Sequence, residues 1–180
     1  MIELQGTLKE RLEKAIELVS TEVTEEEIEY FKNIYEQANI KLSQAAIDFY
    51  KKYGGVYRNK YVLLNNPTFN KEFCLNCYVP PLDYYYKEKF NNENIFRDLE
   101  DAMEYIDDVK KFANQEVCPI ARIGYYYPAE VYIGENGLLY CSYEFQEEIE
   151  TFNTPSEILE QYLKNNIPIG VDEMPIKTEY

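Results

Sequence analysis

The sequence contains no histidine, and this absence excludes several classes of enzyme. Without histidine there is no Ser–His or Cys–His nucleophile pair, no histidine general base, and no ligand for most catalytic zinc sites. Phosphate-binding loops are missing too, because neither Gly54–Gly55 nor the turn from Gly134 to Gly137 has a G-x-x-x-x-G-K or G-x-G-x-x-G context. A carboxylate-dependent hydrolase stays open as an alternative. Among 33 acidic residues, however, some lie close together in any fold, and we expect a protein that is not an enzyme.

We expect neither a membrane-spanning segment nor a secretory leader. No apolar stretch approaches the roughly 18 to 20 residues needed to cross a bilayer. The N-terminal segment MIELQGTLKERLEKAIELV is too charged for a signal peptide. We therefore expect a soluble, cytoplasmic protein.

Cysteine is scarce, and because we expect no leader, its four residues favour reduced thiols over a disulfide framework. Cys74 and Cys77 have the C-x-x-C spacing of a zinc site, which Cys118 and Cys141 would complete in principle. The second pair lacks the short spacing that makes such a site convincing. The first pair does not stand at a strand-to-helix junction with a basic neighbour, as a redox motif would. We expect buried thiols, no metal and no cofactor.

Basic residues are outnumbered 18 to 33, which gives a formal net charge of -15. Between Ile123 and Leu163 there is no Lys or Arg at all, while eight Glu occur. Such a charge repels phosphate backbones and anionic lipids, so we expect no nucleic-acid and no membrane partner. A protein with a basic surface would be attracted and steered.

Enough apolar residues are present for one packed domain over residues 1–180, since 46% are hydrophobic and no linker divides the chain. Three extended runs, 120–123, 129–133 and 138–143, predict an antiparallel meander. The Asn-Gly pair before the third run supplies the positive φ angles of a hairpin turn. We predict an α+β fold in which N-terminal, central and C-terminal helices cover an antiparallel sheet that contains this meander.

Local signals place most of the other elements. Apolar spacing in 8–19 predicts a first helix, Thr24 to Glu27 form a capping box for a second, and Ser43 caps a third over 44–53. Strands are predicted at 56–64 and, more weakly, at 69–79. A capping box at Thr154–Glu157 starts a final helix to about Leu163. The core spans about 24–163, and the proline-containing tail, 167–180, is predicted to be irregular.

Residues 98–111 predict a central amphipathic helix. At about 100° per residue, its apolar side chains face inward: Leu99, Ala102, Met103, Ile106 and Val109. The opposite side is a stripe of carboxylates: Glu100, Asp101, Glu104, Asp107 and Asp108.

This stripe, combined with tyrosines and the Glu-rich region that follows, is a candidate contact surface. Tyrosine is enriched at protein interfaces, where it gives large contact area at little entropic cost. The further candidates are Tyr84, Tyr85, Tyr125, Tyr126, Glu130, Glu147 and Glu148. The alternative interpretation is a solvated helix face with tyrosines in the core.

Several segments together resemble a known family. Segment 43–56 is SQAAIDFYKKYGGV, 119–144 is PIARIGYYYPAEVYIGENGLLYCSYE, and 154–163 is TPSEILEQYL. They resemble the SUKH superfamily of bacterial immunity proteins, most closely its third subfamily. The F-x-x-x-[YF]-G-G motif of that family falls on Phe49, Tyr53, Gly54 and Gly55. Its strand pattern falls on Pro119, Ile120, Tyr132, Ile133, Gly134, Gly137 and Tyr140, with Ala121 where glycine is commoner.

The resemblance implies a cytoplasmic inhibitor that binds and neutralises a cognate bacterial toxin, commonly a nuclease or deaminase, and it implies no catalytic residues. We expect a toxin with a basic surface as the partner, and a monomer or weak dimer. The alternative function is a regulatory protein- or peptide-binding scaffold that is not linked to a toxin.

Overall fold

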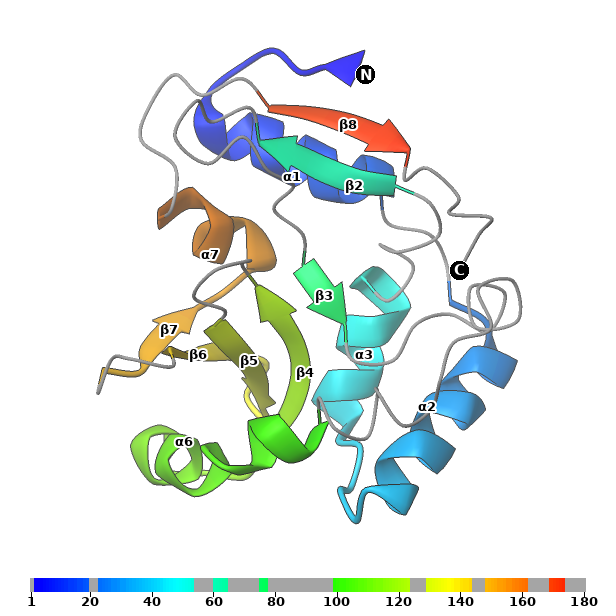
Figure 1. The fold of residues 1–180 in the computed structure, drawn as a ribbon, viewed down its shortest axis with the longest axis vertical. Helices are drawn as coiled ribbons and strands as arrows, with labels where there is room; N and C mark the ends of the chain where they lie inside the picture. Colours follow the sequence, from blue (N-terminus) through cyan, green and yellow to red (C-terminus); the bar gives the residue numbers. More distant parts are fainter. Residues whose placement is uncertain are drawn as a thin grey trace, which may run out of the picture.

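The computed structural model shows helices arranged around antiparallel strands (Figure 1). The described residues are 2–19, 23–53, 60–64, 75–77, 99–123, 129–143, 148–161 and 169–173. Within them the strands form two sheets, one with the order β3-β4-β5-β6-β7 and one with the order β1-β8-β2. The predicted α+β class is therefore confirmed.

The larger sheet contains the predicted meander. Its strands pair antiparallel in sequence order: β4 (Val117–Ile123), β5 (Ala129–Gly134) and β6 (Leu139–Tyr143). The edge strands are β3 (Leu75–Cys77), inside the weaker candidate 69–79, and β7 (Glu150–Phe152), which the sequence does not predict. The meander is thus the middle of a wider sheet.

Gly137 shapes the hairpin turn between β5 and β6. Its φ of 79° lies in the left-handed region, and its N–H donates to the Gly134 carbonyl at 2.9 Å. Asn136 does not have the positive φ predicted for the Asn-Gly pair. Its side-chain oxygen instead accepts a hydrogen bond from the Leu138 N–H at 3.0 Å. The connection is a turn followed by one left-handed glycine rather than a two-residue hairpin loop.

The helices that precede the larger sheet are α1 (Leu8–Val19), α2 (Glu25–Gln37) and α3 (Gln44–Tyr53). The predicted capping box of α2 is present. Glu27 N–H donates to Thr24 Oγ1 at 3.2 Å, and Thr24 N–H donates to Glu27 Oε2 at 2.7 Å. Ser43 Oγ accepts from Ala46 N–H at 3.2 Å at the start of α3. Because such bonds satisfy amides that have no partner inside the helix, local sequence determines where these helices begin.

Helix α7 (Pro155–Gln161) begins at the predicted cap, since Thr154 Oγ1 lies 3.4 Å from the Glu157 N–H. The Glu157 carboxylate, however, accepts from the Asn153 backbone N–H at 2.7 Å and from the Asn153 side chain at 3.1 Å. The return bond therefore reaches one residue further back than a capping box requires.

The prediction of an irregular tail is wrong for Ile169–Glu173, which forms β8. β8 is the middle strand of the smaller sheet, between β1 (Ile2–Glu3) and β2 (Lys60–Leu64). α1 packs against this sheet and against α7, and its Leu12 and Ala15 are fully buried. The core therefore begins before the predicted residue 24, and the fold includes a strand after residue 163.

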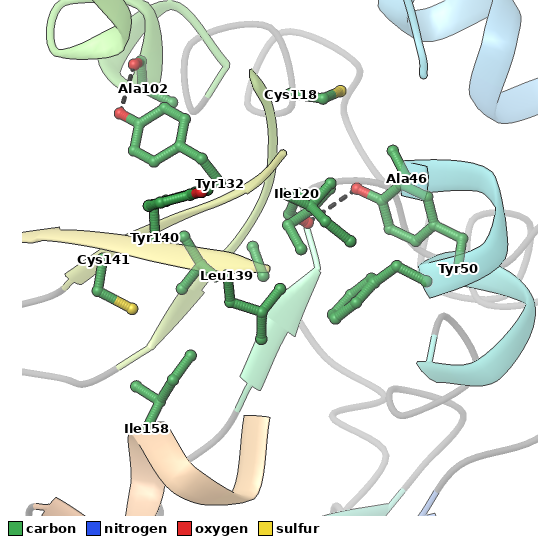
Figure 2. Packing of buried hydrophobic residues seen from close by; sticks show 14 of the residues in the cluster. Ala46, Tyr50, Ala102, Cys118, Ile120, Tyr132, Leu139, Tyr140, Cys141 and Ile158 are labelled. Atoms are coloured by element: carbon green, nitrogen blue, oxygen red, sulfur yellow. Dashed lines mark hydrogen bonds between the residues drawn. The ribbon is translucent and has the colours of Figure 1, made fainter. Parts of the chain in front are cut away.

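The register sorts the side chains of the meander onto two faces. Tyr132 pairs with Tyr140 and lies on one face, while Leu139 lies on the other. On the first face the Tyr132 hydroxyl donates to the Ala102 carbonyl at 2.7 Å, and on the second Leu139 points toward Ile158 of α7 (Figure 2). Since β5 and β6 are buried along their whole lengths, both faces are covered by helices.

A β-bulge in β4 is held by two fully buried tyrosines. The pairing of β4 with β5 shifts between Pro119 and Ala121. Tyr35 of α2 donates a hydrogen bond to the Pro119 carbonyl. Tyr50 of α3 donates to the Ile120 carbonyl at 2.8 Å (Figure 2). The two hydroxyl oxygens lie 2.7 Å apart. This pair, the tyrosine clamp, joins α2 and α3 to the irregular part of the sheet.

Candidate functional site

The most distinctive exposed surface lies on helical residues 99–103 and on α6 (Ile106–Ala113). Leu99, Ala102, Ile106 and Val109 are buried against the sheet. The five predicted carboxylates are all exposed, and we call them the acidic face: Glu100, Asp101, Glu104, Asp107 and Asp108. The predicted separation of acidic from apolar side chains is therefore present except at Met103, which is exposed.

The central helix is not continuous, as the sequence predicts, but is broken at Glu104 and Tyr105. Glu104 N–H bonds to the Asp101 carbonyl at 3.2 Å, and α6 begins at Ile106. In a continuous helix the Ala102 carbonyl would accept from the Ile106 amide. Here the hydroxyl of Tyr132 satisfies it instead. Burial raises the pKa of Tyr132, so this hydroxyl stays protonated and able to donate.

Glu130 does not belong to the exposed surface, and its prediction as a contact residue is not supported. It is 7% exposed on β5, directly opposite Arg122 of β4. Arg122 Nη2 and Nε lie 2.6 and 2.7 Å from Glu130 Oε1. The pairing of Glu130 with Arg122 could not be predicted from the sequence, because it depends on the register between β4 and β5. Arg122 also lies 3.6 Å from Asp101, so it links the acidic face to the sheet.

Two apolar side chains lie exposed on the same segment. Met103, predicted to face inward, is 37% exposed, and Phe112, to which the sequence assigns no role, is 53% exposed. At 100° per residue Phe112 lies to one side of the buried stripe, so its exposure could have been predicted from the sequence. Its ring contacts Tyr140 of β6 edge-on, with centroids 6.2 Å apart. The exposed surface of this segment thus carries two apolar side chains beside the carboxylates.

A hydrogen-bonded network fixes the surface next to Phe112. Gln115 Nε2 donates to the Tyr140 hydroxyl at 2.9 Å, and Asn136 N–H donates to Gln115 Oε1 at 3.1 Å. Asn136 Nδ2 lies 3.2 Å from the same hydroxyl. The aromatic edge of the site is thus held in place by the hairpin turn.

Beside the acidic face lies a groove of about 790 Å³. One wall is the loop between α2 and α3 with the first turn of α3, and the other contains Met103, Ile106 and Lys110. Val117 and Cys118, at the start of β4, line it as well. The exposed Met103 therefore belongs to both the groove and the surface that carries the acidic face.

Several predicted contact residues are not part of this arrangement. Glu148 is exposed just before β7, at the far edge of the larger sheet from β3. The others lie outside the described residues: Tyr84, Tyr85, Tyr125, Tyr126 and Glu147.

Cys118 and Cys141 are free and buried. They stand on β4 and β6, two strands apart, which separates their backbones by roughly 10 Å. A zinc ion about 2.3 Å from each sulfur cannot bridge that gap. Cys74 and the side chain of Cys77 lie outside the described part of the chain. Among the described residues no group of three or more potential ligands is placed to hold a metal ion.

None of the described helices has the length and apolarity to cross a bilayer. Comparison of the chain with protein-family models, with curated proteins and with solved structures gave no match. The resemblance to the SUKH superfamily therefore rests on the residues of this chain alone.

Proposed function

We propose that this protein is a SUKH-like immunity protein that binds and neutralises a bacterial toxin acting on nucleic acid. The observation that supports this most directly is the acidic face together with the exposed Met103 and Phe112 on one continuous segment. A toxin that acts on nucleic acid needs a basic cleft to hold the phosphate backbone. A carboxylate-rich surface is complementary to that cleft and can occlude it.

The mixture of side chains suits a tight and rapid inhibitor. The net charge of -15 raises the association rate with a basic partner, and the effect weakens as salt is added. Charge alone gives little affinity at an exposed rim. Phe112, held against Tyr140, supplies the kind of aromatic anchor that carries most of the binding energy in protein interfaces.

The positions that resemble the SUKH pattern have structural roles consistent with the proposal. Phe49 and Tyr53 lie on α3 with their ring centroids 4.9 Å apart, while Gly54 and Gly55 are outside the described residues. Pro119 lies at the bulge that the tyrosine clamp holds. The inhibitor acts in the cytoplasm under this proposal, where the nucleic-acid substrate of such a toxin is found.

Co-expression with any toxin that a neighbouring gene encodes tests the proposal. We expect a complex that survives purification, and inhibition of the toxin by the purified protein. Neither a complex nor inhibition with any neighbouring toxin would refute the immunity role. Binding to a partner that is not a toxin, with no inhibition, would favour the regulatory scaffold instead.

A charge-matched pair of variants tests the surface itself. One variant neutralises four residues of the acidic face: Glu100→Gln, Glu104→Gln, Asp107→Asn and Asp108→Asn. The control neutralises four exposed acids on α1 and α2: Glu13→Gln, Glu17→Gln, Glu26→Gln and Glu29→Gln. We expect the first to slow association about 10- to 100-fold at low salt, with the difference shrinking at high salt. Equal effects of the two variants would show that only total charge matters and that the acidic face is not the toxin-binding surface.

A further inference from the structure

The groove beside the acidic face lies next to the start of β4. β3 pairs only with residues 121–123 of β4. Val117 and Cys118 therefore have no partner strand on that side among the described strands. This part of β4 is closed by α6 on one face and by the loop before α3 on the other.

Apolar and polar residues contribute about equally to the described lining, which is nearly neutral in charge. Its apolar members come from three stretches of the chain: Ile40, Leu42, Ala45, Ile47, Met103, Ile106, Val117 and Cys118. Lys110 and Glu116 neutralise each other, with Nζ and Oε2 2.8 Å apart. Lys41 and Glu135, also in the lining, are of opposite sign.

The rim differs from the lining because the acidic face borders it. Asp107 is exposed, and it lies three residues before Lys110 on α6 and four residues after Met103, both of which line the groove. A ligand that enters the groove thus meets apolar side chains inside and carboxylates at one edge. The complementary ligand has an apolar part with positive charges next to it.

We propose that this groove receives an apolar side chain from a segment of the partner protein that carries Lys or Arg on both sides of it. The inference rests on the proposed function, since it specifies how the same surface recognises a basic toxin. Protein interfaces commonly combine an apolar anchor in a pocket with charges at its rim. The anchor contributes most of the affinity, and the charges set the orientation of the partner and the association rate.

Two peptides of equal charge test the groove without the toxin. The first is acetyl-KRKLFKRK-amide, and the second is acetyl-KRKSSKRK-amide, titrated into ¹⁵N-labelled protein. We expect the Leu-Phe peptide to shift amides in 39–47 and 103–110 and to bind about tenfold more tightly, since two apolar side chains leave water. Equal affinities and equal shift patterns would overturn the inference, because they would show that the protein recognises only the charge of the peptides.

Variants separate groove binding from general disturbance. Ala45→Phe fills the groove and Met103→Ser removes part of its wall, and each should abolish the difference between the two peptides. Leu18→Phe and Leu18→Ser on α1 are the matched controls, because Leu18 is 38% exposed and remote from the groove. Unchanged discrimination in both groove variants would refute the inference. So would shifts in 39–47 that depend on protein concentration without peptide, because a second copy would then occupy the groove.

The toxin distinguishes failure of the inference from failure of the proposed function. If the wild-type protein inhibits the toxin and Ala45→Phe inhibits it equally well, the groove inference fails and the immunity role stands. If the wild-type protein discriminates between the peptides but inhibits no neighbouring toxin, the groove chemistry stands and the immunity role fails.

Discussion

The tyrosine clamp contains three close oxygen contacts but only two hydroxyl protons. If Tyr35 donates to Pro119 and Tyr50 donates to Ile120, no proton remains for the 2.7 Å contact between the two hydroxyls. If one hydroxyl donates to the other, one carbonyl loses its donor from the clamp. The contact between the hydroxyls therefore cannot add a third full hydrogen bond.

Substituting Phe for Tyr35 and Tyr50 tests whether the two hydroxyls form a third hydrogen bond with each other. Tyr50→Phe leaves the buried Ile120 carbonyl without its hydroxyl donor, and Tyr35→Phe does the same to Pro119. A buried group that loses its partner costs about 1–3 kcal/mol, out of the roughly 5–15 kcal/mol by which a domain of this kind is stable. The double variant should cost about 2–6 kcal/mol, and at least the sum of the two single variants, because no third bond is lost.

Urea unfolding at 25 °C, followed by far-UV circular dichroism and tyrosine fluorescence, gives the three free energies. Tyr105→Phe is the control, since it removes the hydroxyl of a half-buried tyrosine away from the clamp and keeps its ring, and it should change stability by less than about 0.5 kcal/mol. A double variant that costs clearly less than the sum would refute the proton count, because it would show a favourable bond between the hydroxyls.

Three further predictions concern the sheet, a helix cap and the thiols. Glu130→Ala leaves the guanidinium of Arg122 without its closest carboxylate and should lower the free energy of unfolding by about 3 kcal/mol; a loss under about 0.5 kcal/mol in urea would show that the pair is dispensable. Hydrogen bonds from Asn153 lower the pKa of Glu157, so its stabilisation is complete above the unfolded-state pKa and is lost as pH falls through the lower folded-state pKa. The melting temperatures of wild type and Glu157→Gln should therefore differ at pH 6 and converge towards pH 2–3, and a constant difference would contradict this. Burial raises the pKa of the Cys118 thiol to about 12 and also raises the pKa of the Cys141 thiol. In a variant in which Cys74 and Cys77 are replaced by serine, a disulfide reagent at pH 8 should therefore label neither thiol until urea unfolds the protein.

The sequence predicts the elements whose signals are local. Thr24, Ser43 and Thr154 mark the starts of three helices because each cap is made by a side chain within three residues of the amide that it satisfies. The meander is equally predictable, since its strands are adjacent in the chain and their side chains are β-branched or aromatic.

Elements that depend on distant partners are not predictable in this way. β8 is short, contains a glycine and follows a proline, so it looks irregular until β1 and β2 provide hydrogen bonds on both of its sides. The break before α6 depends on the Tyr132 hydroxyl, which is thirty residues away from the carbonyl it binds. The same holds for the candidate contact residues. The acidic face can be predicted from helical periodicity, whereas the burial of Glu130 can be predicted only when its pairing with Arg122 across β4 and β5 is known.

The position of β8 also has a consequence for the timing of folding. α1 packs against α7, β8 and β2, so the apolar side of a helix made early is covered by segments made up to roughly 150 residues later. At translation rates of about 5–20 residues per second, that delay is on the order of 10 to 30 s. During this time Leu12 and Ala15, fully buried in the finished protein, lack their cover and are available to chaperones or to other nascent chains. The smaller sheet thus makes completion of the fold dependent on the arrival of a single five-residue strand.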